Sequence, residues 1–239
     1  MTGASSGLGR ATATALARGG ASVALLARHE RDLGALADDL SRDGQSALAM
    51  PADLADAASI EQAMTRVAVA LGPVGVLVNA AATDAPGPVS ELSVEDWDRV
   101  QAVNLRAVFL LCKLVVPGMA AAGQGTIVNV SSVAGRRGWA EASAYCASKF
   151  ALTGFTQALA AEVRPHGVRA CVVYPGAMAT HWGTFAPEER DQGDGVDGRP
   201  EDRLPPDTVA SYIAWLVTAP PELVVNESTV TPLNEQGWP

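Results

Sequence analysis

The chain alternates between short apolar runs and longer stretches in which apolar residues recur with helical spacing. The short runs are rich in Val, Leu, Ile and Ala and predict buried strands, whereas the longer stretches predict helices. The predicted strands are Ser22–Ala27, Ala47–Met50, Val76–Asn79, Thr126–Val130, Val168–Tyr174 and Ser228–Thr231. The predicted helices are Leu8–Arg18, Glu30–Arg42, Ala57–Leu71, Val94–Met119, Tyr145–Val163 and Asp207–Thr218.

The order of these elements predicts the architecture of the fold. Strands and helices follow one another in turn, which predicts an α/β fold with a doubly wound parallel sheet and helices on both faces. The strand runs are apolar almost throughout, as a sheet covered on both faces requires. With 239 residues, of which 48% are hydrophobic and 18% charged, the chain suits a single domain over 1–239.

The segment 183–206 departs from this alternation because glycines, prolines and charged residues dominate it. We expect a flexible loop beside the substrate. A calcium-binding loop is the alternative, but the acidic residues do not fall at alternate positions that end in a bidentate Glu.

Charge and cysteine content limit the classes of partner and compartment. The 17 basic and 26 acidic residues give a net charge of −9, which disfavours nucleic acids and anionic membranes as partners. Cys112, Cys146 and Cys171 form no CxxC pair, which is typical of reduced thiols in the cytoplasm. Lys113 and Pro117 interrupt the most apolar stretch, and no signal-peptide pattern precedes the first motif, so we expect no membrane segment.

A glycine-rich segment, Thr2–Gly9, leads directly into the first predicted helix. Glycines permit a tight turn and let the backbone approach a pyrophosphate, and the free N–H groups at a helix start attract its negative charge. The segment therefore predicts the phosphate loop of a Rossmann-like dinucleotide-binding domain, although an ordinary turn between strand and helix has the same composition. The expected cofactor contacts in this loop are Gly3, Ser5, Ser6, Gly7, Leu8 and Gly9.

Further cofactor contacts are predicted where other strands end. Arg28 directly follows a strand, at a position where an Arg accommodates a 2′-phosphate, so NADP(H) is favoured over NAD(H). A solvated surface Arg is the alternative for this position, as a turn or helix N-cap is for Asp53. The remaining expected contacts at strand ends are Asp53, Leu54, Asn79, Ala80, Ala81, Pro175, Gly176, Met178 and Thr180.

Three residues form a candidate catalytic set. Tyr145 and Lys149 are four positions apart on one predicted helix, so they share a helix face. A lysine ammonium beside a tyrosine favours the phenolate and is expected to lower the pKa of Tyr145 enough for acid–base chemistry. Ser132 follows a predicted strand and is placed to donate a hydrogen bond to the substrate oxygen.

Taken together, these motifs resemble those of the short-chain dehydrogenase/reductase family over nearly the whole chain. The matching pieces are TGASSGLG, Asp53-Leu54, LVNAA, Val103-Asn104-Leu105, NVSS, YCASK and PGAMAT. The resemblance implies that Ser132, Tyr145, Lys149 and Asn104 are catalytic, and we expect no metal at the site. It further implies that Tyr145 exchanges a proton with the substrate oxygen, that Lys149 also holds the nicotinamide ribose, and that Asn104 organises a water molecule.

The resemblance also bears on specificity and assembly. The segment Leu223–Glu227 resembles members that use NADP and act on small carbonyl compounds or hydroxy acids. The long helices that carry Asn104 and Tyr145 imply a homodimer or homotetramer. Thr180 is expected to bind near the nicotinamide carboxamide.

The sequence departs from the family at its beginning. Only Met1 precedes Thr2, so we expect the sheet to lack its first, central strand. The gap would measure roughly 9.6 Å, which is two strand spacings, and it would leave two unpaired strand edges. Burial of four apolar side chains there would contribute on the order of 6–12 kcal/mol. Either the true start lies upstream of Met1, or the protein is impaired.

The leading functional hypothesis is an NADP(H)-dependent oxidoreductase that interconverts a small carbonyl compound and its alcohol. The alternative is a catalytically impaired nucleotide-binding or assembly protein, motivated by the missing strand. An epimerase or dehydratase acting on nucleotide sugars would need a larger substrate domain than this chain length allows.

Overall fold

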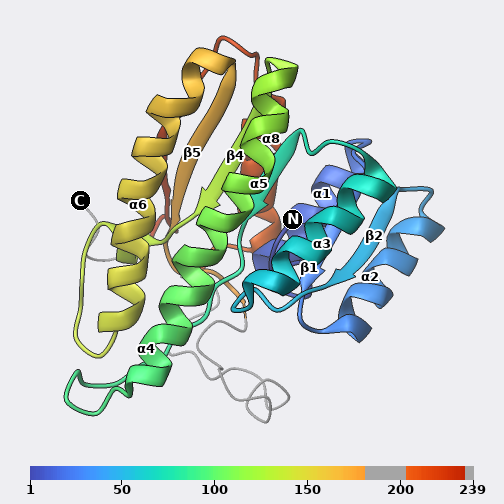
Figure 1. Ribbon diagram of the computed structural model, residues 1–239. Coiled ribbons are helices and arrows are strands. Elements are labelled where there is room, and N and C mark those ends of the chain that lie inside the picture. The colour runs from blue at the N-terminus through green and yellow to red at the C-terminus, as the bar shows by residue number, and fades with distance from the viewer. Residues whose placement is uncertain (181–202, 235–239) are drawn as a thin grey trace.

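The computed structural model describes residues 1–180 and 203–234 (Figure 1). Most of the predicted substrate loop, 183–206, lies outside the described residues.

The strands form a parallel sheet in the order expected of a doubly wound fold. They are β1 (Val23–Ala27), β2 (Ala47–Pro51), β3 (Val76–Asn79), β4 (Gly125–Val130), β5 (Val168–Pro175) and β6 (Glu227–Val230). β1 pairs with β2, and the remaining strands pair in the order β3-β4-β5-β6. Every pair is parallel, so all strands end at the same edge of the sheet. The predicted strands are confirmed, with ends that shift by one residue.

The helices also follow the predicted ranges, with one interruption. They are α1 (Gly7–Arg18), α2 (Glu30–Arg42), α3 (Ala57–Leu71), α4 (Val94–Gln101), α5 (Ala107–Ala122), α6 (Ser143–Val163) and α8 (Pro206–Thr218). The single helix predicted over Val94–Met119 contains a π-helical turn, η1 (Ala102–Arg106), between α4 and α5. By length and composition the continuous segment Val94–Ala122 is apolar enough to span a membrane, a test that core helices of soluble proteins also pass.

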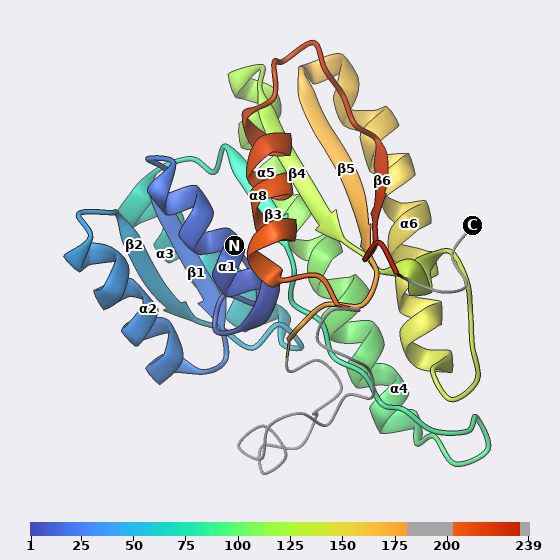
Figure 2. The same cartoon turned by 180° about the vertical axis from the view of Figure 1, so that it is seen from behind.

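Helices cover both faces of the sheet, as the views from the two sides show (Figures 1 and 2). On one face, α1, α2 and α8 bury an apolar cluster that includes Leu33 and Ile213. On the other face, α3, α5 and α6 bury a second cluster that includes Ile60 and Leu111. The predicted doubly wound arrangement is therefore confirmed.

Met1 and Thr2 join the two parts of the sheet. The Met1 ammonium donates to the Ala24 carbonyl (2.9 Å), and the Leu26 N–H donates to the Met1 carbonyl (2.9 Å). On the other side, the Thr2 N–H donates to the Val78 carbonyl (3.0 Å). These two residues lie at the central position of the sheet, where we expected the first strand to be missing, and among the described residues no strand separates β1 from β3.

Candidate active site

The predicted site residues gather at the edge of the sheet where the parallel strands end. Arg28 follows β1, Ser132 follows β4 within two residues, and Pro175 closes β5. The glycine loop reaches the same edge, because a Cβ built on Gly7 would lie 3.3 Å from Cγ2 of Thr180. Segments far apart in the sequence therefore meet at one place.

Ser132, Tyr145 and Lys149 form a compact cluster, in which Tyr145 and Lys149 are buried and Ser132 is partly buried. Tyr145 and Lys149 lie on the same face of α6 and are only 8% and 2% exposed. A side-chain hydrogen bond joins Ser132 to Tyr145. The Lys149 ammonium donates to the Val130 carbonyl at the end of β4 (2.9 Å), and its nitrogen lies 5.5 Å from the centre of the Tyr145 ring. The structure thus brings the three predicted residues together.

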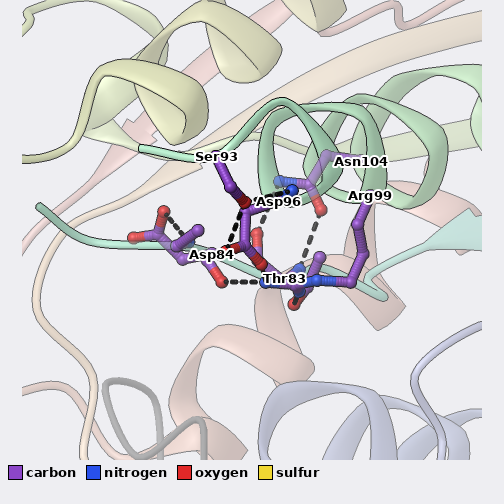
Figure 3. A network of polar contacts seen from close by, with 7 residues as sticks. Thr83, Asp84, Ser93, Asp96, Arg99 and Asn104 are labelled. Atoms are coloured by element: carbon purple, nitrogen blue, oxygen red, sulfur yellow. Dashed lines mark hydrogen bonds and ion pairs between the residues drawn. The ribbon is translucent and has the colours of Figure 1, made fainter. Parts of the chain in front are cut away.

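Asn104 lies in the π-helical turn η1 and is 1% exposed. Its side-chain oxygen accepts from the Thr83 N–H (2.8 Å), and its amide nitrogen donates to the Thr83 carbonyl (2.8 Å) (Figure 3). The same nitrogen donates to Ser148 on α6 (3.0 Å). The Asn104 side chain therefore ties the loop after β3 to α6, and its implied part in organising water stays a prediction.

The glycine loop has no room for side chains at two of its positions. Gly3 adopts a φ of +68°, and a Cβ there would lie 2.9 Å from the backbone nitrogen of Ala81. A Cβ on Gly9 would lie 2.0 Å from the Gly3 carbonyl oxygen. The loop is consequently folded tightly beneath the start of α1, which leaves its outer side as bare backbone.

The start of α1 is suited to an anion. The N-cap residue, Ser6, makes no side-chain cap hydrogen bond, and the first turn contains no acidic residue. The first-turn N–H groups of a helix lack partners within the helix and carry partial positive charge, so they attract a phosphate. The residues present therefore fit the phosphates of a dinucleotide.

Comparison with known proteins decides the family. The sequence profile described as short chain dehydrogenase matches residues 1–191. The chain belongs to the short-chain dehydrogenase/reductase family. It is therefore an oxidoreductase that acts on CH–OH groups, as the sequence predicted.

Among relatives of this short-chain dehydrogenase, D-threitol dehydrogenase from Mycolicibacterium smegmatis is 40% identical over 183 residues, covering 77% of this chain and 70% of that protein. L-xylulose reductase from Mus musculus is 40% identical over 184 residues, covering 77% of this chain and 72% of that protein. A metagenomic short-chain oxidoreductase solved in complex with NADP is 34% identical and has a TM-score of 0.83. That comparison covers 98% of this chain and 96% of the other.

Burial shifts the pKa values of Tyr145 and Lys149 in the candidate catalytic cluster of this short-chain dehydrogenase. It raises the pKa of the Tyr145 hydroxyl above its ordinary value, the Ser132 hydrogen bond lowers it, and the charge of Asp84 raises it further. Burial lowers the pKa of Lys149 to about 7. The sequence predicted that Lys149 lowers the pKa of Tyr145, and the direction found here is the opposite. Burial outweighs charge because the Lys149 ammonium is itself desolvated and donates to Val130.

Some predicted cofactor contacts are available only through their backbone. Asn79 was predicted as a cofactor contact, and its side chain points inward, where it donates to Asn129 on β4 (2.9 Å). The reason is strand alternation, since Asn79 shares a face with Leu77, which packs in the cluster beneath α5. Leu8 and Leu54 are also buried in the apolar clusters, so their side chains serve packing.

Other predicted contacts keep their side chains at the surface of the edge. Arg28 is exposed and forms no ion pair within the described chain, so its guanidinium is accessible to an anionic group. Asp53 acts as a turn residue, because its carboxylate accepts from the Ala55 N–H (2.9 Å). The structure therefore shows Asp53 as a turn residue, which was the alternative to a cofactor contact.

The sequence analysis assigned no side-chain role to two residues at this edge. The Thr2 hydroxyl accepts hydrogen bonds from the N–H groups of Ala80 (3.0 Å) and Ala81 (3.1 Å), and thereby fixes the backbone that follows β3. Asp84 lies in the same loop and is 8% exposed. An acidic residue shortly after the small residues 80–82, at an edge already predicted to bind ligands, was the available signal for Asp84.

Proposed function

We propose that this short-chain dehydrogenase uses NADP(H) to interconvert a small polyhydroxylated ketone and its alcohol, with Tyr145 as the proton-transfer residue. The observation that carries the proposal is the compact cluster of Ser132, Tyr145 and Lys149, which lies at the same sheet edge as the glycine loop. When bound, a nicotinamide cofactor supplies or accepts the hydride. The protein must supply the proton and hold the substrate oxygen.

The cluster is arranged to handle that proton. Because the pKa of Tyr145 is raised, its hydroxyl is protonated near neutral pH and is able to donate to a carbonyl oxygen during reduction. Ser132 approaches the same hydroxyl, so a substrate oxygen placed between them would receive two hydrogen bonds. Lys149, with its pKa lowered to about 7, is able to exchange a proton near neutral pH at the rear of the cluster.

The preference for NADP(H) over NAD(H) rests on Arg28. Its exposed guanidinium directly follows β1, where it is placed to pair with a 2′-phosphate. No acidic residue stands at the end of β1 to hold a free ribose hydroxyl. A related oxidoreductase solved in complex with NADP supports the same choice.

The substrate class is proposed from two relatives whose names refer to polyols and ketoses. D-threitol dehydrogenase and L-xylulose reductase are both 40% identical to this chain over more than three-quarters of its length. Both names describe small substrates with several hydroxyl groups. A ketose or polyol of similar size is therefore the first substrate to test.

The test is a cofactor-oxidation assay with NADPH and NADH over a panel of small ketones. We expect turnover with ketoses and a preference for NADPH. Tyr145→Phe should lower kcat by at least about 100-fold and leave NADPH binding nearly unchanged. Tyr212→Phe, on α8 away from the cluster, is the matched control and should keep full activity. Retained turnover in Tyr145→Phe would remove Tyr145 from the mechanism, and inactivity with every ketone would favour the non-catalytic alternative.

We also propose that the protein forms a homodimer or homotetramer through α5 and α6. Large apolar side chains are exposed on these helices, with Phe109 45%, Leu114 42% and Phe150 47% accessible. Phe109 also lines a surface groove of about 840 Å³ together with Leu105 and other residues of α4, η1 and α6. Light scattering should show an oligomer that Phe109→Asp dissociates, whereas Trp215→Asp on α8 should not. A monomeric parent protein would refute the proposal.

A further inference from the structure

Asp84 lies in the loop after β3, and contacts that do not involve its carboxylate fix its position (Figure 3). Asn104 holds both backbone groups of the preceding residue, Thr83. The Arg99 guanidinium donates to the Asp84 carbonyl (3.2 Å) and to the Thr83 hydroxyl (2.6 Å). Removal of the carboxylate would therefore leave the loop anchored.

A second anchor places this loop beside the catalytic helix. The Gly87 N–H donates to the Glu141 carbonyl (2.8 Å), and Gly87 forms a β-bridge with Ala142. Ala142 lies directly before α6, three residues ahead of Tyr145. The charge of Asp84 acts on the Tyr145 hydroxyl, so the carboxylate lies within electrostatic reach of the catalytic cluster.

One oxygen of the Asp84 carboxylate is available to a ligand. Oδ1 accepts from the N–H of Ala85 (2.7 Å), whereas Oδ2 makes no hydrogen bond within the described chain and is not sealed from solvent. Figure 3 shows the carboxylate directed away from Arg99 and Asn104. Arg99 pairs instead with Asp96 (2.8 Å), so the carboxylate of Asp84 has no ion-pair partner in this network.

A carboxylate in such a place affects substrates differently according to their chemistry. A buried carboxylate oxygen without a hydrogen bond is costly, so a substrate that covers it with an apolar group is disfavoured. A substrate that carries its own carboxylate meets a like charge. A neutral substrate with hydroxyl groups displaces water from the Asp84 carboxylate, but one of its hydroxyls then donates a charge-assisted hydrogen bond in place of that water.

We propose that Oδ2 of Asp84 accepts a hydrogen bond from a substrate hydroxyl close to the reacting carbon, and so selects neutral, polyhydroxylated ketones and alcohols. This inference rests on the proposed function, because it assigns a specificity determinant within the same site. It makes Asp84 a substrate-recognition residue outside the set Ser132, Tyr145, Lys149 and Asn104.

Three four-carbon substrates test the inference. They are erythrulose, which has several hydroxyl groups, 2-butanone, which has none, and acetoacetate, which is anionic. Values of kcat/KM are compared for the parent protein and for Asp84→Ala, with Asp84→Asn as an isosteric variant and thermal melts to verify folding. The matched control is Asp96→Asn, which removes a carboxylate of the same network that is paired with Arg99 and Ser93.

For Asp84→Ala we expect kcat/KM with erythrulose to fall about 10- to 100-fold, the usual effect of losing a hydrogen bond to a charged group. The value with 2-butanone should fall much less, and acetoacetate should become a relatively better substrate. Asp96→Asn should leave the ratio of erythrulose to 2-butanone unchanged. An equal loss with all three substrates in both Asp84 variants would overturn the role of Asp84 while the proposed function stands. A parent protein inactive with every ketone would overturn the proposed function and this inference with it.

Discussion

The hydroxyl of Thr2 provides a sharp test of how the sheet is held together. Thr2 is 2% exposed, and its Oγ1 accepts hydrogen bonds from the N–H groups of Ala80 and Ala81. Thr2→Val keeps the shape of the side chain and removes the acceptor. Two part-buried N–H groups then lose their partner in the folded protein.

The magnitude follows from the desolvation of those two groups. An unsatisfied buried donor costs about 1–3 kcal/mol, and both N–H groups are only part-buried, so a combined loss of about 2–4 kcal/mol is expected. A domain is stable by only about 5–15 kcal/mol, so this loss is large. Thr2→Ser keeps the acceptor and removes one methyl group, which should cost about 1 kcal/mol.

Urea unfolding followed by circular dichroism measures both variants. The same samples should show weaker NADPH binding for Thr2→Val, because Ala80 and Ala81 form the backbone beside the expected cofactor position. If Thr2→Val lost no more stability than Thr2→Ser, the hydroxyl would not be what fixes the backbone after β3.

Three further predictions concern the glycine loop, Arg28 and Lys149. Gly9→Ala should abolish NADPH binding in a fluorescence titration, because the new Cβ would lie 2.0 Å from the Gly3 carbonyl, whereas Gly34→Ala, with no atom within 4 Å, should bind normally. Arg28→Asp should raise KM for NADPH at least about 10-fold, with little change in KM for NADH. If the ratio of the two KM values were unchanged, Arg28 would not determine the choice between NADPH and NADH. For Lys149, the pKa falls from 10.5 in the unfolded chain to about 7 in the folded protein, so the unfolded chain binds the extra proton and stability rises with pH between these values. The free energy of unfolding of the parent protein should therefore rise relative to Lys149→Met by about 1.4 kcal/mol per pH unit between about pH 7.5 and 9.5, measured by urea titration at each pH. If the difference in free energy of unfolding between the parent protein and Lys149→Met stayed constant over this pH range, the lowered pKa of Lys149 would be refuted.

Much of the fold could be predicted because it depends on local pattern. The ranges of α2, α3 and β3 agree with the predictions at both ends, since each is a run of one periodicity bounded by residues that end it. The π-helical turn within Val94–Met119 was not predicted. Its residues include no Gly or Pro to mark a break, and the turn places Asn104 against Thr83 and Ser148, which only the folded chain brings near.

Some features of the candidate site could also be predicted from local pattern, whereas others required the tertiary structure. Spacing along one helix was enough to predict that Tyr145 and Lys149 share a face, and the order of strands was enough to predict that the glycine loop, Arg28 and Ser132 meet at one edge. The direction of the Asn79 side chain could not be predicted in this way. A strand residue can point to either face of the sheet, and only the pairing of β3 with β4 shows that Asn79 faces Asn129.

The sequence by itself determined which chemical groups the protein carries and at which end of the sheet they stand, because both depend on residue identity and on the repeat of strand and helix. Only the tertiary structure decided how those groups behave. Burial, and not the nearby Lys149 ammonium, controls the pKa of Tyr145. Burial also lowers the pKa of Lys149 to about 7. The position of Asp84 Oδ2, which makes no hydrogen bond within the described chain, likewise depends on the tertiary structure, because contacts of Asn104, Arg99 and Gly87 hold its loop beside α6. Desolvation and three-dimensional contact depend on atoms far apart in the chain, so no local pattern records them.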